Sequence, residues 1–242
     1  MTLILAITCK DGIVFASDGQ ATRVIDEKAT TSKAIKIYRL GKNALWGCAG
    51  IETCVSRFWS FLRDTVDETK DCSFDDIQLR ANLKEVADNT KNEANYRSRT
   101  FNVAKRCSEY LVVMHQKFPM IWWMADGCGS TFFGKDEQEL TKCCMFSIGD
   151  GSGQIVAQAL FDNLKDKDRE FTLAQGSLIV YRLIKEAMNS SPEVGKFVDI
   201  WTIKDNAVER KTDDEIEELN NLSDDWIKEE RRVSDGILFS LL

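Results

Sequence analysis

The sequence predicts an α+β protein in which helices pack on sheets. Short apolar runs joined by turn residues come in groups, and so do the longer segments of helical periodicity. Their order is strands, two helices, strands, two helices, strands and a last helix. Runs of strands followed by runs of helices favour this class over alternating βαβ units, which would build a parallel sheet.

The first fifty residues predict two β-hairpins. An apolar run, Leu3–Cys9, is followed by the turn Lys10-Asp11-Gly12 and a second run, Ile13–Ser17. An Asp-Gly pair between two such runs is a strong hairpin signal. The runs 35–40 and 44–49 repeat the pattern around the turn 41–43, and Gly50 closes the pair.

Helical periodicity then replaces the strand pattern. One helical face is formed by Val55, Phe58, Trp59, Leu62 and Val66. We expect a second helix over 74–97, with Ser73 as its N-cap.

The rest of the chain predicts further strands and helices. Strands are expected over 110–115, 120–124, 131–133, 143–148, 197–203 and 207–211, and helices over 152–164, 173–188 and 213–232. Acidic residues begin the last helix and basic residues end it, which suits the helix dipole. We interpret it as an added docking helix, with a contact in a dimer or ring as the less favoured alternative.

Composition narrows the class of protein. The chain has 242 residues and a net charge of −7, so it has no overall basic field for nucleic acid. No apolar run reaches the roughly 18 residues that cross a bilayer, and the first run lacks the basic flank of a signal peptide. We expect a cytoplasmic protein that binds neither nucleic acid nor membrane. Without a Pro- or Ser-rich linker, residues 1–242 read as a single domain in which 213–242 form a C-terminal helical extension.

The cysteines indicate a reduced protein and no metal site. There are eight cysteines and one histidine, and no Cys-x-x-Cys pair. Free cysteine is among the most buried residue types, so these residues read as small core side chains. We expect no metal and no other cofactor.

Thr2 follows Met1 and immediately begins a strand. A small second residue permits removal of the initiator methionine, which would leave Thr2 with a free α-amino group of pKa about 7.7 to 8.0. A base of that pKa beside a hydroxyl on the same residue is a self-contained activated nucleophile.

Three further residues strengthen this interpretation. Asp18 ends the second strand, and in a hairpin it would lie beside the start of the first. Lys36 opens the third strand, where a lysine held near a carboxylate could lower the pKa of the hydroxyl and relay its proton. Gly50 follows the fourth strand and offers an unhindered backbone N–H for an oxyanion hole.

These motifs resemble the N-terminal-threonine peptidases, namely the proteasome β subunits and the bacterial HslV-type peptidase. The resemblance is carried by the start Thr2-Leu3 with 10–14, by the run 16–22 (ASDGQAT), and by 36–40 (KIYRL) leading to Ala49-Gly50. A weaker similarity lies in residues 147–153, where a Gly-Ser-Gly turn begins a helix. The resemblance implies the four-layer αββα sandwich of the N-terminal-nucleophile hydrolases.

The resemblance also implies roles for single residues. Thr2 would be the nucleophile and its own amine the base, with Asp18 and Lys36 orienting and tuning it and the Gly50 N–H holding the oxyanion. The backbone of Thr22 would pair with substrate as an added strand. The residues that fall where the family lines its first specificity pocket are Ala21, Ala34, Tyr38, Cys48 and Glu52.

One of the departures from the family is at position 150. Asp150 stands where the family usually has a serine that hydrogen-bonds the threonine amine. An aspartate near the amine would hold it protonated and weaken it as a base. Alternatively, Asp150 faces solvent and Ser152 takes the role.

We therefore expect a threonine peptidase that hydrolyses peptides or unfolded proteins. By resemblance it would form a homo-oligomeric ring and could work with an ATP-dependent unfoldase. Two alternatives stay open: a non-catalytic ring or scaffold subunit that keeps Met1, and a small-substrate amidase or transpeptidase on the same fold.

Overall fold

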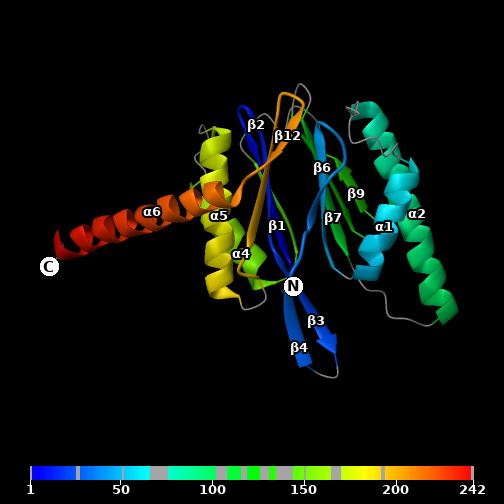
Figure 1. Ribbon diagram of the computed structural model, residues 1–242, viewed down its shortest axis with the longest axis horizontal. Helices are drawn as coiled ribbons and strands as arrows, with labels where there is room; N and C mark the ends of the chain where they lie inside the picture. Colours follow the sequence, from blue (N-terminus) through cyan, green and yellow to red (C-terminus); the bar gives the residue numbers. More distant parts are fainter. Residues whose placement is uncertain are drawn as a thin grey trace.

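The computed structural model describes residues 2–25, 28–50, 52–65, 76–101, 108–115, 119–125, 131–134, 144–149, 151–164, 170–191 and 194–240. Two sheets face each other, and a pair of helices covers the outer face of each sheet (Figure 1). The predicted α+β class and the four-layer αββα arrangement are confirmed.

Both large sheets are antiparallel and have five strands. The first has the order β10-β1-β2-β11-β12, with β1 Leu3–Cys9, β2 Gly12–Asp18, β10 Met145–Gly149, β11 Val198–Lys204 and β12 Ala207–Arg210. The second has the order β5-β6-β7-β8-β9, with β5 Ile37–Arg39, β6 Ala44–Ala49, β7 Glu109–His115, β8 Pro119–Ala125 and β9 Thr131–Gly134. The strands predicted from apolar runs are all present, and most of their ends differ by one or two residues.

The helices are α1 Glu52–Thr65, α2 Asp76–Phe101, α4 Ser152–Leu164, α5 Leu173–Ser190 and α6 Asp213–Ser240. The second helix was expected over 74–97 and instead begins at Asp76 and continues to Phe101. The last helix was expected to end at Arg232 and continues to Ser240. The turn that extends α2, residues 98–101, carries too few apolar residues to show the helical period.

Three apolar layers hold the sandwich together. Alternate residues of β1 point to opposite faces of the sheet, because side chains in a strand have a period of two. Leu3, Leu5 and Ile7 pack toward α4 and α5, whereas Ile4 and Ala6 pack between the sheets. The third layer joins the second sheet to α1 and α2. Both faces of β1 are therefore buried, which fixes its register and the position of its first residue.

A two-stranded arm was not predicted. β3 (Gln20–Ile25) continues directly from β2 and pairs with β4 (Lys28–Lys33). The arm extends from the body of the molecule beside the N-terminus (Figure 1).

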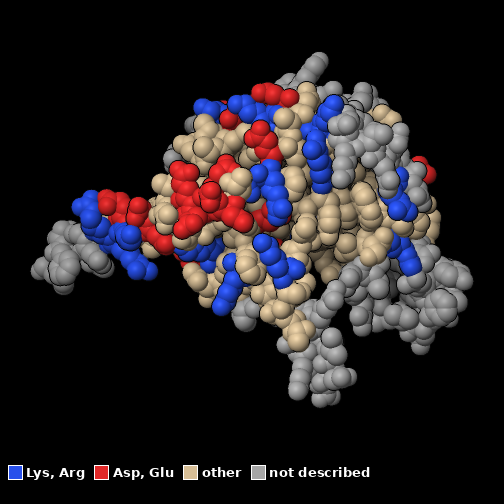
Figure 2. Space-filling view, viewed as in Figure 1, with Lys and Arg blue, Asp and Glu red and all other residues tan. Residues whose placement is uncertain are grey.

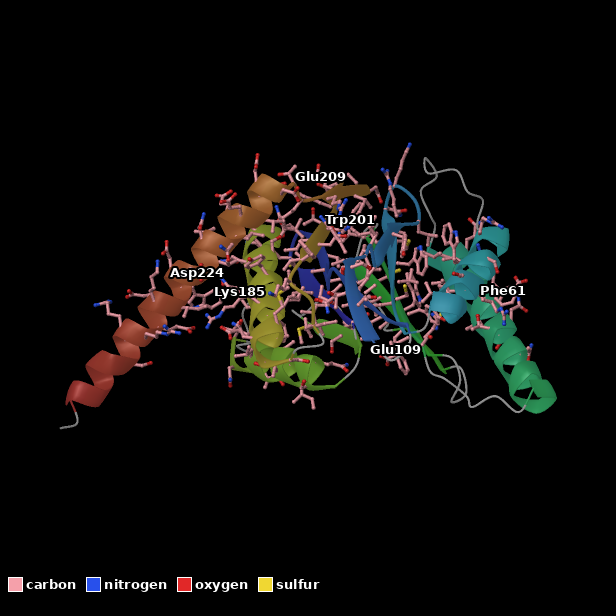
Figure 3. All side chains as sticks on the ribbon, turned by 60° about the horizontal axis from the view of Figure 1, so that its bottom comes forward. Phe61, Glu109, Lys185, Trp201, Glu209 and Asp224 are labelled. Atoms are coloured by element: carbon pink, nitrogen blue, oxygen red, sulfur yellow. The ribbon has the colours of Figure 1, made fainter. Side chains whose placement is uncertain are left out.

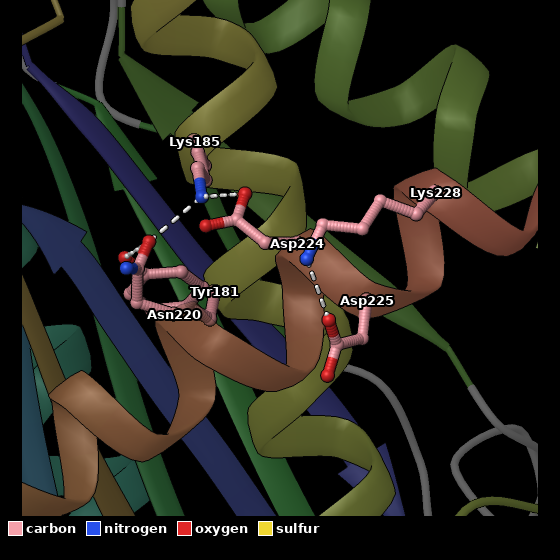
Figure 4. A network of polar contacts seen from close by, with 6 residues as sticks. All are labelled: Tyr181, Lys185, Asn220, Asp224, Asp225 and Lys228. Carbon is pink, nitrogen blue, oxygen red and sulfur yellow. Dashed lines mark hydrogen bonds and ion pairs between the residues drawn. The ribbon is translucent and has the colours of Figure 1, made fainter. Parts of the chain in front are cut away.

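The C-terminal helix docks on α5, as expected. Lys185 Nζ donates to Asn220 Oδ1 at 2.7 Å and to Asp224 Oδ1 at 2.8 Å, and the Tyr181 hydroxyl also donates to Asn220 (Figure 4). One turn further, the guanidinium of Arg182 lies 4.2 Å from the ring centre of Trp226. The far end of α6 runs beyond α5 (Figure 1).

Charge is unevenly distributed over the visible surface. Acidic side chains gather over the first part of α6 (Figure 2), where the first turn contributes Asp213, Asp214 and Glu215. None of the helices in the described part of the chain combines the length and apolar character that crossing a bilayer requires.

Candidate active site

Thr2 lies immediately before β1 and is partly buried. The end of β10 lies against it, because Leu3 pairs with Gly149 in the β1–β10 register. Gly149 has φ +135°, and a Cβ atom on it would lie 1.9 Å from the Thr2 carbonyl oxygen. Only glycine fits this close approach, so the two strands together fix the backbone of the candidate nucleophile.

Asp18 is the last residue of β2, and the hairpin brings it beside the start of β1. Its side chain is fully buried. Oδ1 accepts from the Leu3 N–H at 2.7 Å and from Lys36 Nζ at 2.7 Å. Oδ2 accepts from the Gly195 N–H at 2.9 Å and from the Gln20 N–H at 3.3 Å. The carboxylate thus anchors the residue that follows Thr2 and holds four separate parts of the chain together.

Lys36 precedes β5 and is 6% exposed. Burial lowers the pKa of Lys36 below its ordinary value of 10.5, and the neighbouring Asp18 carboxylate opposes that shift. Its backbone carbonyl accepts the Cys48 N–H at 3.3 Å, which ties Lys36 to β6. An ammonium with a lowered pKa at this place is suited to stabilise a developing alkoxide or to pass a proton.

Gly50 follows β6 and has φ +134°. A Cβ atom on it would lie 2.4 Å from the Ser108 Oγ and 2.7 Å from the Ser108 Cβ. The left-handed backbone and the close approach both require glycine. The glycine after β6 therefore packs directly on Ser108, the residue before β7.

Cys48 and Tyr38 lie on the face of the second sheet that packs toward α1. Cys48 is buried, and burial raises the pKa of its thiol to about 12. Tyr38 stacks on Trp46 with ring centres 4.7 Å apart, and its hydroxyl donates to the Ile35 carbonyl. Tyr38 is therefore held against the sheet.

Ala21 and Ala34 flank the base of the arm. The Ala34 N–H donates to the Gly19 carbonyl at 2.9 Å and closes the hairpin. Thr22 pairs with Thr31 in the β3–β4 register. One edge of β3 is thus occupied by β4, and substrate pairing would use the opposite edge.

For the remaining predicted residues the structure describes the backbone, the exposure or nothing at all. Ser152 is the first residue of α4 and is exposed. Glu52 begins α1, but its side chain lies outside the described residues, as does the side chain of Thr22. Asp150 also lies outside the described residues.

Two residues near the site were not predicted from the sequence. The Gly195 N–H is a donor to Asp18, and the Glu109 carboxylate accepts the Gly149 N–H at 3.0 Å through Oε2. The sequence gives only a weak signal for either residue. Gly195 belongs to a Val-Gly pair before a late strand, and Glu109 is an acidic residue directly before the apolar run 110–114.

The chain resembles known proteins in sequence over its first half and in fold over nearly its whole length. Residues 2–111 match a family model described as Proteasome subunit. The chain is similar to the Gly-1 mutant of Anbu from Hyphomicrobium sp. strain MC1, with 15% identity, 97% of each chain covered and a TM-score of 0.68. It is also similar to Anbu, named as an ancestral beta-subunit, from Yersinia bercovieri, with 14% identity, 96% of each chain covered and a TM-score of 0.66. A comparison with curated protein sequences gave no match. The predicted resemblance is confirmed.

Proposed function

Because residues 2–111 match the family model of proteasome subunits, we propose that the chain is a threonine peptidase whose nucleophile is Thr2. One observation carries the proposal: the buried Asp18 carboxylate binds both the Leu3 N–H and the Lys36 ammonium at 2.7 Å. An aspartate that only capped a turn and a lysine that only ended a strand would lie in solvent. They would not be buried together beside the first residue of β1.

The proposed reaction begins once Met1 has been removed. The Thr2 α-amine takes the hydroxyl proton as Oγ attacks the carbonyl carbon of the scissile peptide bond. The C–N bond then breaks, the departing amine receives that proton, and an ester forms on Thr2. Water attacks the ester with the α-amine as base, which releases the acid and regenerates the hydroxyl.

Charged and polar groups around Thr2 would support both steps. The Lys36 ammonium stabilises negative charge on Oγ, and Asp18 holds that ammonium in place. The Gly50 N–H is proposed to donate to the oxyanion of the tetrahedral intermediate. Neither role needs a metal ion or another cofactor.

The proposed substrates are peptides and unfolded proteins. By analogy with the family, substrate residues before the scissile bond would pair with the free edge of β3 near Ala21 and Thr22. Ala34, Tyr38, Cys48 and Glu52 would define the first specificity pocket. A homo-oligomeric ring and an ATP-dependent unfoldase are part of the same analogy.

The amine has two proposed neighbours, Asp150 and Ser152. If Asp150 contacts the amine, it raises the pKa of that amine and shifts the pH optimum of acylation upward. If Ser152 makes the contact, Asp150→Ser leaves the pH profile unchanged. Comparing the pH profiles of the parent protein and this variant separates the two arrangements.

The first experiment is the intact mass of the purified protein with and without a threonine-directed β-lactone. Loss of Met1 and a single covalent adduct that is absent from Thr2→Ala are the expected results. Thr2→Ser, which keeps a hydroxyl, is expected to keep the adduct. Retained Met1 with no adduct would contradict the proposal and favour a non-catalytic ring or scaffold subunit.

A further inference from the structure

A cavity of about 290 Å³ is lined in part by β10, the strand that pairs with β1. Its walls come from β7 and β8 of the second sheet, from β10 of the first sheet and from α4. Its lining residues are Glu109, Leu111, Trp123, Phe146, Ser147 and Gln154. Drug-sized ligands usually occupy pockets of about 300 to 1,000 Å³, so this cavity suits one long side chain.

Glu109 connects the cavity to the nucleophile. Its Oε2 accepts the Gly149 N–H at 3.0 Å, and Gly149 pairs with Leu3, the residue after Thr2. Within the described part of the chain, no other hydrogen bond to this carboxylate is present. Figure 3, in which the lower end of Figure 1 comes forward, shows Glu109 at that end of the second sheet.

The rest of the lining favours a cation. Gln154 Nε2 donates to both the carbonyl and the hydroxyl oxygen of Ser147, each at 3.0 Å. Both amide hydrogens are therefore used, and the Gln154 side chain offers only its oxygen to a ligand. Trp123 and Phe146 add aromatic surface, which attracts cations. Carboxylate and amide oxygens beside aromatic rings are the chemistry that binds ammonium or guanidinium groups.

The strand order places the cavity on one side of the nucleophile. β1 lies between β2 and β10. In the proposed function, substrate residues before the scissile bond follow β3, which continues β2. The side of β1 that faces β10 therefore receives the residues after the scissile bond. Ser147 is two residues from Gly149, or about 7 Å along the strand, which a lysine or arginine side chain can span.

We propose that this cavity is a specificity pocket for a lysine or arginine side chain on the leaving-group side of the substrate, with Glu109 as its anionic residue. The proposal rests on the proposed function. In this assignment Glu109 has two contacts: one carboxylate oxygen positions Gly149 against Thr2, and the carboxylate charge selects the substrate.

The test compares Glu109→Gln with Glu209→Gln. The first variant keeps an oxygen that can accept the Gly149 N–H and loses the charge. The second removes the same charge from β12, at the opposite edge of the first sheet. Peptides with identical residues before the cleaved bond would carry Lys, Arg, Met or Glu at the first and second positions after it, and cleavage sites would be mapped by mass spectrometry.

The parent protein and Glu209→Gln are expected to cleave the Lys and Arg peptides about tenfold more efficiently in kcat/KM than the Met peptide, as for a charged hydrogen bond in a partly buried site. In Glu109→Gln this preference should disappear, measured as the ratio of kcat/KM for the Lys or Arg peptide to kcat/KM for the Met peptide. Equal cleavage of Lys and Met peptides by the parent protein would overturn the pocket assignment, and so would an unchanged preference in Glu109→Gln.

A binding measurement keeps the two proposals distinguishable. Isothermal titration of the same peptides into Thr2→Ala, with and without Glu109→Gln, needs no turnover. If no adduct and no cleavage occur, the proposed function fails. The cation pocket would still be supported if Thr2→Ala binds the Lys peptide more tightly than the Met peptide and this difference disappears when Glu109→Gln is added. Equal binding of the Lys and Met peptides by Thr2→Ala would refute it.

Discussion

The Asp18 carboxylate lies 2.7 Å from the Lys36 ammonium and accepts the Leu3 N–H through the same oxygen. A single oxygen, Asp18 Oδ1, thus holds both the start of β1 and the Lys36 ammonium. A buried ion pair contributes little net stability, because removing both charges from water costs about as much as their attraction returns. The proposed role at Thr2 therefore accounts for the pair better than a contribution to the stability of the fold.

We expect Asp18→Asn to destabilise the protein by about 3 kcal/mol, because it leaves the buried Lys36 charge without its partner. The amide also cannot accept all the hydrogen bonds that the carboxylate accepts. Urea denaturation measures the loss, and peptidase activity should fall with it. Lys36→Met in the Asp18→Asn background is expected to recover part of the stability and none of the activity.

The matched control for this pair is the exposed ion pair between Lys228 and Asp225, at 2.9 Å. Lys228→Met should change the free energy of unfolding far less than Asp18→Asn does, because solvent screens an exposed pair. A loss at Lys228 as large as the loss at Asp18 would contradict the argument from burial.

Gly149→Ala is expected to abolish activity and to destabilise the fold, because the new Cβ would lie 1.9 Å from the Thr2 carbonyl oxygen. Gly151 is a close control. It also has a positive φ, +75°, but a Cβ there would meet nothing within 4 Å among the described residues. Gly151→Ala should therefore cost only backbone strain, about 1 kcal/mol, and keep the β-lactone adduct. Equal activities of the two variants would show that the contact with Thr2 is unimportant.

The Cys48 thiol should be unreactive in the folded protein. Its pKa of about 12, raised by burial, leaves about one thiolate in ten thousand at pH 8. Iodoacetamide labelling followed by peptide mapping should modify Cys48 only after denaturation, and the half-buried Cys144 earlier. Rapid labelling of Cys48 in the native protein would mean that the pocket beside Lys36 is open to solvent.

His115 should make the fold sensitive to acid. Burial lowers the pKa of His115 below 6.5, while Asp205 and Asp11 oppose the shift. Between the pKa of His115 in the folded protein and 6.5, the unfolded chain binds more protons than the folded one. The free energy of unfolding that neutral His115 contributes is therefore full above pH 6.5 and falls as the pH drops toward the pKa of the folded protein.

The protein has a single histidine, so its ring protons give one titration curve by NMR, with a midpoint expected below 6.5. His115→Gln should reduce the difference in unfolding free energy between about pH 7 and about pH 5.5. A midpoint above 6.5, or an unchanged difference in His115→Gln, would reject this explanation.

The sequence predicted the parts of the fold that carry local signals. The β1–β2 hairpin has an Asp-Gly turn between apolar runs, and Asp18 could be expected beside Leu3 for that reason alone. The β3–β4 arm was missed because its residues, such as Thr30, Thr31 and Ser32, are polar and exposed and show no apolar alternation. Such strands follow from pairing in space and carry little pattern in sequence.

The contacts of Glu109 and Gly195 could not be predicted for a different reason. Glu109 reaches Gly149 only because the two sheets stack, and Gly195 reaches Asp18 across 177 positions of the chain. Neither residue has a neighbour in sequence that signals the contact. Packing between layers, which no local pattern encodes, decides both.

The convergence of distant segments on Asp18 has a consequence for the newly made protein. Leu3, Gln20 and Lys36 leave the ribosome early, but Gly195 follows only after most of the chain has been synthesised. A growing chain that ends before Gly195 lacks one of the donors that fix the carboxylate. The candidate site is therefore complete only once Gly195 has been synthesised, and the proposed peptidase would be inactive in a nascent chain that ends before that residue.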